Sequence, residues 1–283
     1  MFSFATDDSV SADKFFAALK VYMSGSPDYT DNGEYHYWFI LPLGPGSFMF
    51  LMNAWFAPGV GKKELQSRVE PVLEKMRDAG VDVSANYAEY NDFFTMWKAT
   101  FPLEEVGSDN AITTSRLLPR KNFQDKKKFD DTFDVIRWTS EEIGSLVFGF
   151  TIRGSGADGV FEDNAVNPAW RDASMHAMTG ITWDSSISAK ERSDLAADLT
   201  NNIMGKWRDV TPGSGSYMSE GDPNEPNWQQ SFFGCKYSKL YQLKQKWDPT
   251  GLLYANRAVG SEDWYIEGQD PNIAMQNGRL CKA

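Results

Sequence analysis

The sequence is poor in the residues that metal centres and disulfide frameworks need. It has two cysteines, Cys235 and Cys281, and two histidines, His36 and His176, in 283 residues. The histidines are too far apart in the chain to form a spacing motif, and the cysteines lack the spacing of metal ligands. We therefore predict no metal site and no disulfide framework. A single bridge between Cys235 and Cys281 stays open.

Long apolar runs and a positive charge balance are also absent. No run approaches the roughly 20 apolar residues of a membrane-spanning helix. The first ten residues, MFSFATDDSV, contain neither a basic segment nor a long apolar core, so no secretory signal is predicted in this chain. The formal net charge of −11 opposes binding to a phosphate backbone or an anionic membrane surface. We therefore expect neither nucleic acid nor membrane as a partner.

Aromatic residues are abundant instead. They make up 14% of the chain and include ten tryptophans. Such an excess is typical of a thick core, and it also suits a pocket for a flat organic molecule. The length accommodates one large domain or two small ones.

Helical and strand patterns mix without a regular alternation of strand and helix. Helices are expected over 11–23, 62–79, 91–101, 125–143 and 188–207, and strands over 35–41, 48–56, 81–87, 112–118, 146–152 and 170–183. Ser11 and Ser188 are expected to cap their helices, and Glu191, three residues after Ser188, completes a capping box. Pro71 should kink or split its helix. The strands at 35–41 and 48–56 are almost continuously apolar, so we expect both faces of this hairpin to be covered. The pattern predicts an α+β fold, a largely antiparallel sheet with flanking helices, followed by a C-terminal helix and turn segment.

The strand expected over 170–183 has one unusually polar face. Asp172, Ser174 and His176 alternate along it. Buried polar side chains need partners or water. Two interpretations stay open, a solvated outer face or a sheet that lines a wet pocket.

No self-contained catalytic motif is present in the sequence. A serine elbow, a histidine-rich metal helix and a phosphate-binding loop are all missing. The glycine-rich stretch at 153–159 lacks the Gly-Lys-Ser/Thr ending of a phosphate loop, so we interpret it as a mobile loop.

The remaining polar cluster consists of Tyr217, Glu220 and Asp222, which precede a helix expected to begin near Asn227. On an extended chain, carboxylates two positions apart point to the same side. A shared apolar site would raise the pKa of one of them and make it a usable general base. Alternatively, both carboxylates are solvated or cap the helix.

Several ordered motifs resemble the C-terminal half of fungal FAD-linked oxidoreductases of the berberine-bridge-enzyme type, in the vanillyl-alcohol-oxidase-like superfamily. These motifs are YMSEGD (217–222), WQQSFFG (228–234), KWDPTGLLY (246–254), VGSEDW (259–264) and GRLC (278–281), with NPAWR (167–171) and FAPG (56–59) further upstream.

The resemblance implies a domain organisation. It assigns 1–210 to a substrate-binding domain, with an antiparallel sheet over the flavin ring, and 211–283 to a berberine-bridge-like C-terminal segment. The family's N-terminal FAD domain, with its phosphate-binding segments and flavin-linking histidine, has no counterpart in this sequence. FAD is the implied cofactor, a separate FAD domain is an implied partner, and family members are often secreted.

The resemblance also implies roles for individual residues. Tyr217 would lie near the flavin ring, Glu220 would be the catalytic base, and Ser219 would face the cofactor. The family usually has Asn where this chain has Ser219, and a short hydroxyl does not span what an amide does. Arg116, His176 and Asp222 are the expected substrate-binding residues. Residues 247–249, Trp-Asp-Pro, are expected to hold the fold.

Two functions from different classes follow. The first is part of an FAD-dependent oxidoreductase, in truncated or split form, that oxidises a small organic substrate, a secondary metabolite or a sugar-like molecule, with oxygen as acceptor. We expect little activity from such a fragment without the FAD domain. The alternative is a redox-silent binding or cyclisation protein that keeps only the substrate pocket.

Overall fold

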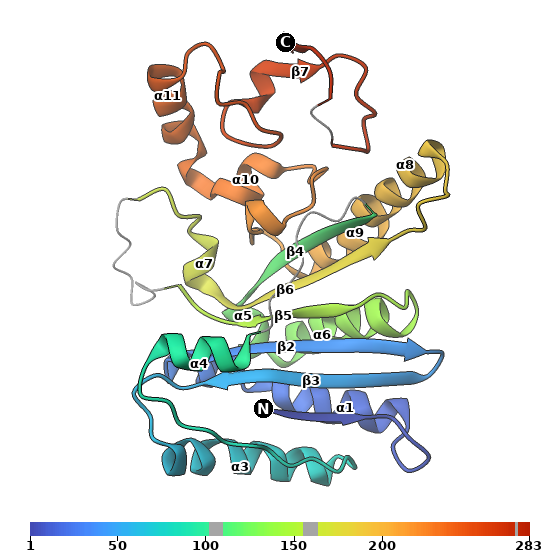
Figure 1. The fold of residues 1–283 in the computed structure, drawn as a ribbon, viewed down its shortest axis with the longest axis vertical. Coiled ribbons are helices and arrows are strands. Elements are labelled where there is room, and N and C mark those ends of the chain that lie inside the picture. The colour runs from blue at the N-terminus through green and yellow to red at the C-terminus, as the bar shows by residue number, and fades with distance from the viewer. Residues whose placement is uncertain (102–109, 155–163, 275–276) are drawn as a thin grey trace. The chain divides into compact units, whose positions relative to one another are not determined.

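The computed structural model describes residues 1–101, 110–154, 164–274 and 277–283 (Figure 1). It divides into two compact units. The first unit comprises Met1–Asp109, Arg120–Arg153 and Ser174–Thr179, and the second comprises Asn110–Pro119, Gly154–Ala173 and Gly180–Ala283. Most of the glycine-rich stretch at 153–159 lies outside the described residues.

The first unit is built on an antiparallel sheet. Its strands are β1 (Phe2–Ala5), β2 (Tyr35–Gly44), β3 (Ser47–Phe56), β5 (Val147–Thr151) and the 174–179 part of β6 (Ala173–Thr182), in the order β1-β3-β2-β5-β6. Every neighbouring pair is antiparallel. This confirms the predicted hairpin and the sheet-based α+β fold.

Helices accompany this sheet within the same unit. They are α1 (Ala12–Ser24), α2 (Ser26–Asp31), α3 (Lys62–Asp78), α4 (Phe93–Thr100), α5 (Arg120–Gln124) and α6 (Lys126–Glu141). Figure 1 shows α1 and α6 along the sheet, and both contact its strands. Pro71 lies inside α3, which continues through it as one helix.

The core of the first unit is aromatic because α1 and β3 present large rings to one another. Phe16 of α1 meets Phe48 of β3 edge to face, with ring centroids 5.0 Å apart. The ring centroid of Tyr22, further along α1, lies 5.3 Å from that of Phe50. All four side chains are at most 1% exposed, so nearly all of their apolar surface is removed from water, which stabilises the folded unit.

The opposite face of the hairpin is only half-buried, which corrects the expectation that both faces are covered. Alternate residues of β3 are buried and half-buried. On the half-buried face, Phe39 stacks on Phe148 and Tyr35 stacks on Phe150. Aromatic residues occupy both faces of the two strands, so the sequence did not reveal which face is only half-buried.

The second unit combines one longer strand with helices and turns. Its elements are β4 (Ala111–Pro119), α7 (Ala169–Asp172), the end of β6, α8 (Ala189–Asp198), the π-helical turn η1 (Leu199–Ile203), α9 (Met204–Val210), the 3-10 turns η2 (Met218–Glu220), η3 (Gly234–Lys236) and η4 (Ser261–Asp263), α10 (Trp228–Phe233), α11 (Tyr237–Trp247), β7 (Trp264–Ile266) and β8 (Leu280–Lys282). The capping box predicted at Ser188 and Glu191 is confirmed.

Two predicted strands need correction. Residues 81–87 alternate between buried and exposed, with Val81 and Val83 buried, but they pair with no strand among the described residues. Alternation specifies faces and not a ladder partner, which explains the error. Residues 170–172 belong to α7, so the long strand begins only at Ala173.

Cys235 and Cys281 are free thiols, so the single bridge left open by the sequence is not formed. Within the described parts of the chain, no helix is both long and apolar enough to cross a bilayer.

Candidate functional site

The candidate site is a tight turn at residues 217–221, called the site turn below. Met218–Glu220 form the 3-10 turn η2, in place of the extended segment expected from the sequence. The tighter backbone separates the two carboxylates, because Glu220 is half-buried while Asp222 is 1% exposed. The prediction that both point into one shared site on an extended chain is therefore wrong.

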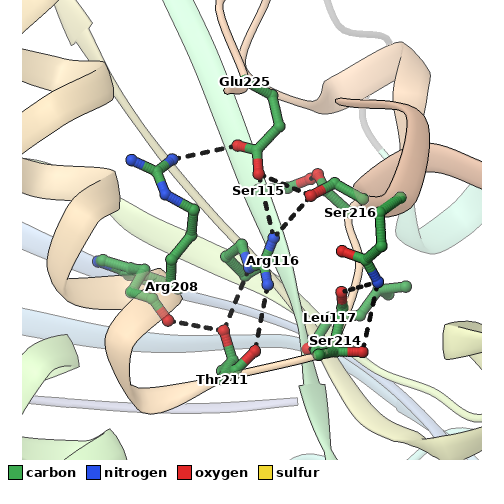
Figure 2. Close-up of polar contacts among 12 residues, drawn as sticks. Ser115, Arg116, Leu117, Arg208, Thr211, Ser214, Ser216 and Glu225 are labelled. Atoms are coloured by element: carbon green, nitrogen blue, oxygen red, sulfur yellow. Dashed lines mark hydrogen bonds and ion pairs between the residues drawn. The ribbon is translucent and has the colours of Figure 1, made fainter. Parts of the chain in front are cut away.

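The segment before the site turn lies along β4 (Figure 2). The Leu117 backbone N–H donates to the Gly215 carbonyl at 2.8 Å, and the hydroxyls of Ser115 and Ser216 are 2.8 Å apart. The Ser214 hydroxyl donates to the Leu117 carbonyl. Three consecutive residues are thus attached to one strand, which limits the freedom of the turn that follows.

Glycines on both sides of the site turn are in close contact with their neighbours. A Cβ at Gly215 would lie 2.7 Å from both the Asn167 amide nitrogen and the Ser231 carbonyl oxygen. A Cβ at Gly221 would lie 2.6 Å from the Phe232 ring. Both positions require glycine for close approach of the backbone.

A buried ion pair holds the same segment from within. The Arg116 guanidinium is 3.4 Å from Glu225 and donates to the hydroxyl and the carbonyl of Thr211, each at 3.2 Å. Arg208 lies 3.2 Å from the other Glu225 oxygen, and the Ser231 hydroxyl donates to Glu225 at 2.7 Å (Figure 2). Burial lowers the pKa of Arg116, and the facing Glu225 carboxylate opposes that shift. These contacts favour a structural task for Arg116 over contact with substrate.

Tyr217, Met218 and Ser219 are the exposed members of the site turn. Tyr217 is 41% exposed, and its ring meets Trp170 edge-on with centroids 5.8 Å apart. Trp170 lies in α7, three residues after Asn167, and the Asn167 amide donates to the Ser231 carbonyl at 2.7 Å. The site turn therefore presents an aromatic surface whose support comes from the α7 region.

Asp222 is occupied by the backbone that follows it. Its carboxylate accepts from the Asn224 N–H at 2.8 Å, and the Asn224 side chain donates to the Asn272 carbonyl. Burial raises the pKa of Asp222, although the Asn224 bond opposes it. Asp222 thus stabilises a turn, in the manner of an Asx turn.

His176 belongs to the first unit, whereas the other five predicted site residues belong to the second. It lies on β6, with its ring 6.1 Å from Phe150, and burial lowers its pKa to about 4. Ser174 and His176 are at most 1% exposed. The solvated outer face considered for this strand is therefore wrong.

Three structural residues of the site escaped the sequence analysis: Glu225, Asn167 and Trp170. Glu225 and Arg116 are 109 positions apart, so no local pattern links them. The Asn-Pro-Ala-Trp-Arg sequence was noticed, and its Asn and Trp are the residues that support the site turn.

Comparison with known proteins now adds to this geometry. The family described as "Berberine and berberine like" matches residues 216–260, which contain the site turn. The FAD-linked oxidoreductase patO of Penicillium expansum is 29% identical over 274 residues, which cover 96% of this chain and 45% of patO. ZEB1 of Gibberella zeae, also named as an FAD-linked oxidoreductase, is 28% identical over 99% of this chain and 46% of its own length.

A solved structure shows the same fold. The flavoprotein MtVAO713 of Myceliophthora thermophila, of the vanillyl-alcohol-oxidase type, superimposes with a TM-score of 0.81 at 23% identity. The superposition covers all of this chain and 50% of the MtVAO713 chain. Residues 216–260 thus match the berberine-like family, and almost the whole chain is similar to fungal FAD-linked oxidoreductases. It spans about half the length of the curated relatives it matches.

The similarity to FAD-linked oxidoreductases raises the question of whether the described residues suit FAD. The exposed ring of Tyr217 suits contact with a flat ring system. The Gly59–Lys62 turn at the start of α3 does not suit a phosphate, because the Glu89 carboxylate already accepts the Lys62 N–H at 3.1 Å. The exposed Tyr217 ring is thus compatible with a flat ring system, and the N-terminus of α3 does not offer a cradle for phosphates.

The berberine-bridge-like segment also carries an exposed apolar patch around the end of α11. The patch consists of Leu243, Trp247, Leu252 and Leu253, and the last three are 73–85% exposed. Asp248 shapes it by accepting the N–H groups of Leu252 and Leu253, each at 2.9 Å. Asp248 therefore holds the local fold as expected, whereas Trp247 lies open to solvent.

Proposed function

We propose that this chain is the substrate-binding and berberine-bridge-like part of an FAD-dependent oxidoreductase. The domains are 1–210 and 211–283, and the substrate is a small organic molecule, a secondary metabolite or a sugar-like compound. Oxygen is the final acceptor. The family match over 216–260, which contains the site turn, carries this proposal.

FAD, when bound, would accept the hydride, and the residues of this chain would remove the proton and position the reactants. Glu220 takes the proton from the substrate hydroxyl as the adjacent C–H bond gives up its hydride. Tyr217 and Ser219 would hold the flavin of bound FAD, and Asp222 and Arg116 keep the turn in place. A half-buried carboxylate on a constrained turn suits a general base, because its position is defined while substrate can still reach it.

The phosphates of FAD require a further domain. We propose that an FAD domain covers the apolar patch of Leu243, Trp247, Leu252 and Leu253. Isolated patches of large apolar side chains mark interaction sites. The relatives are about twice as long as this chain, which leaves room for such a domain.

The experiment compares three purified samples: this chain alone with added FAD, this chain co-expressed with the FAD domain of a relative such as patO, and a longer single chain that carries both. We expect the first to stay colourless and inactive and the others to be yellow. In an active sample, Glu220→Gln should lower kcat by about 10²–10⁴-fold. The matched control is Met218→Leu on the same turn, which should keep activity.

A yellow and active short chain would overturn the requirement for a further domain. Full activity of Glu220→Gln would remove Glu220 as the base. Either result leaves the family assignment intact, so the two failures can be told apart.

The replacement of the usual Asn by Ser219 favours a second candidate, a redox-silent binding or cyclisation protein. Such a protein would bind small organic molecules without FAD. Calorimetric titration with candidate substrates, with and without FAD, separates the two functions. Binding that is independent of both FAD and the FAD domain would support the second candidate.

A further inference from the structure

The first unit contains a cavity of about 670 Å³ next to the C-terminal end of β3. It is lined by the end of β3, the turn at 57–61, the start of α3, residues 85–92 and the start of α4. Its size lies within the roughly 300–1,000 Å³ that is typical of small-molecule sites. All lining residues belong to the first unit, and none of the predicted site residues is among them.

The floor of this cavity is apolar and buried. It includes Ala54 and Trp55 of β3 and Val69 of α3, which are 2–7% exposed. The rim adds Tyr90 and Phe93, which are 38% and 73% exposed. An open aromatic rim over a buried apolar floor is the composition expected of a site for a flat hydrophobic molecule.

The wall at residues 85–92 is held in place, so the cavity is formed before any ligand arrives. The Asn86 N–H donates to the Met1 carbonyl at 2.9 Å, and the Met1 nitrogen donates to the Asn86 carbonyl at 3.0 Å. Further along, the Glu89 carboxylate accepts the Lys62 N–H of α3. A preformed wall reduces the entropy lost on binding.

The charges at the rim do not favour an anionic ligand. The carboxylates of Glu89 and Asp92 are engaged by the backbone at the starts of α3 and α4. The lining residues also provide two cations, Lys62 and the Met1 amino group, whose pKa burial lowers, so the rim has no excess of positive charge. The amides of Asn86 and Asn91 remain exposed and offer neutral hydrogen-bonding groups.

We propose that this cavity binds an uncharged, flat aromatic molecule that carries one hydrogen-bonding group. The ring system inserts over Trp55 between the rim aromatics, and the polar end meets the rim amides. The ligand class follows from the lining alone and does not depend on the proposed oxidoreductase function.

The test uses the uncharged fluorescent dye N-phenylnaphthylamine with the purified chain. We expect saturable binding with one dye per chain. Phe93→Ala should weaken it by about tenfold or more, since a large apolar contact is lost. Ala88→Trp, at an exposed lining position, should block binding by filling the space.

The matched control is Phe94→Ala. Phe94 neighbours Phe93 on α4 and is 65% exposed, but it does not line the cavity. The affinity of the Phe94→Ala variant for the dye should stay within twofold of that of the unchanged protein. Equal losses for Phe93→Ala and Phe94→Ala would show adsorption to the surface of α4 and overturn the proposal.

Three other outcomes would also overturn it. Absence of saturable binding removes the site. Tighter binding of the anionic dye anilinonaphthalene sulfonate contradicts the uncharged ligand class. If sedimentation shows that the unchanged protein is a dimer and that Phe93→Ala is a monomer, the occupant of the cavity is a second copy of the chain and not a small molecule.

Discussion

The two units bury a glutamate in different ways. In the first unit, Glu34 accepts from the Trp55 indole at 2.9 Å and from Arg68 at 3.0 Å, and the Arg68 side chain is 29% exposed. In the second unit, Glu225 faces Arg116, whose side chain is itself only 3% exposed. The Glu34 carboxylate is thus paired with Arg68, which reaches in from the surface. Glu225 has a comparable partner in Arg208, whose side chain is 20% exposed, and in addition it is paired with the almost fully buried Arg116.

This difference shows which unit depends more on each polar partner. Burial alone raises the pKa of Glu34, but the bonds from His36, Arg68 and Trp55 together bring it below its usual value. If Glu34 is removed, Arg68 can turn into solvent. If Glu225 is removed, Arg116 stays buried without its carboxylate, which is the costly case for an ion pair.

The largest expected effect is therefore that of Glu225→Ala. Loss of one partner of a buried pair costs about 3–5 kcal/mol of unfolding free energy. Glu34→Ala should cost about 1–3 kcal/mol, mainly because the Trp55 N–H loses its acceptor. Urea denaturation of both variants measures the difference.

The control replaces both partners, Arg116→Met with Glu225→Leu. It should recover much of the loss, because both fully buried charges are removed and the remaining Arg208, 20% exposed, can reach solvent. If Glu34→Ala proves as costly as Glu225→Ala, the contrast between the two units fails.

The next effect concerns acid, and it should come from the first unit, which contains both histidines. Burial lowers the pKa of His36 and of His176 to about 4, below the ordinary value of 6.5. Between pH 6.5 and 4 the unfolded chain takes up these protons and the folded chain does not, so stability falls as the pH falls. Each histidine contributes about 3 kcal/mol over the whole window, at about 1.4 kcal/mol per pKa unit.

Unfolding free energies from urea titrations at pH 7, 6 and 5 check this slope. A His176→Asn variant should show a shallower loss than the unchanged protein, whatever its stability at pH 7. Equal slopes would mean that the acid sensitivity arises elsewhere.

A smaller effect contrasts two glycines within the second unit. Gly215→Ala should cost about 1–3 kcal/mol, because the new methyl group meets Asn167 and Ser231 at 2.7 Å. Gly205→Ala in α9 meets nothing within 4 Å and should stabilise the helix by up to about 1 kcal/mol. Thermal melts of the two variants should shift in opposite directions, and a harmless Gly215→Ala would contradict the close packing before the site turn.

The smallest effect compares the helix caps of the two units. Ser188 and Glu191 cap α8 reciprocally, whereas Ser11 caps α1 with a single bond to Lys14 at 3.3 Å. Ser188→Ala should cost about 1 kcal/mol, and Ser11→Ala should cost less. Melting temperatures of the pair decide the order, and a larger loss for Ser11→Ala would reverse it.

Much of the fold could be predicted because the relevant patterns are local. The Ser11 cap, the 35–56 hairpin and the capping box at Ser188 each depend on residues a few positions apart, and all three are confirmed. The strand expected over 81–87 failed for the opposite reason. Its alternation was correct for burial, but pairing depends on a neighbouring strand, and the segment has none among the residues that the structure describes.

The candidate site divides in the same way. The sequence by itself determined the order of Tyr217, Ser219 and Glu220, together with the stop after α11, since neighbouring residues encode turns and caps. Only the tertiary structure decided that Arg116 meets Glu225, that Asp222 is buried while Glu220 is not, and that Phe93 stays exposed. Burial and charge pairing depend on which distant segments meet, and a local pattern does not contain that information.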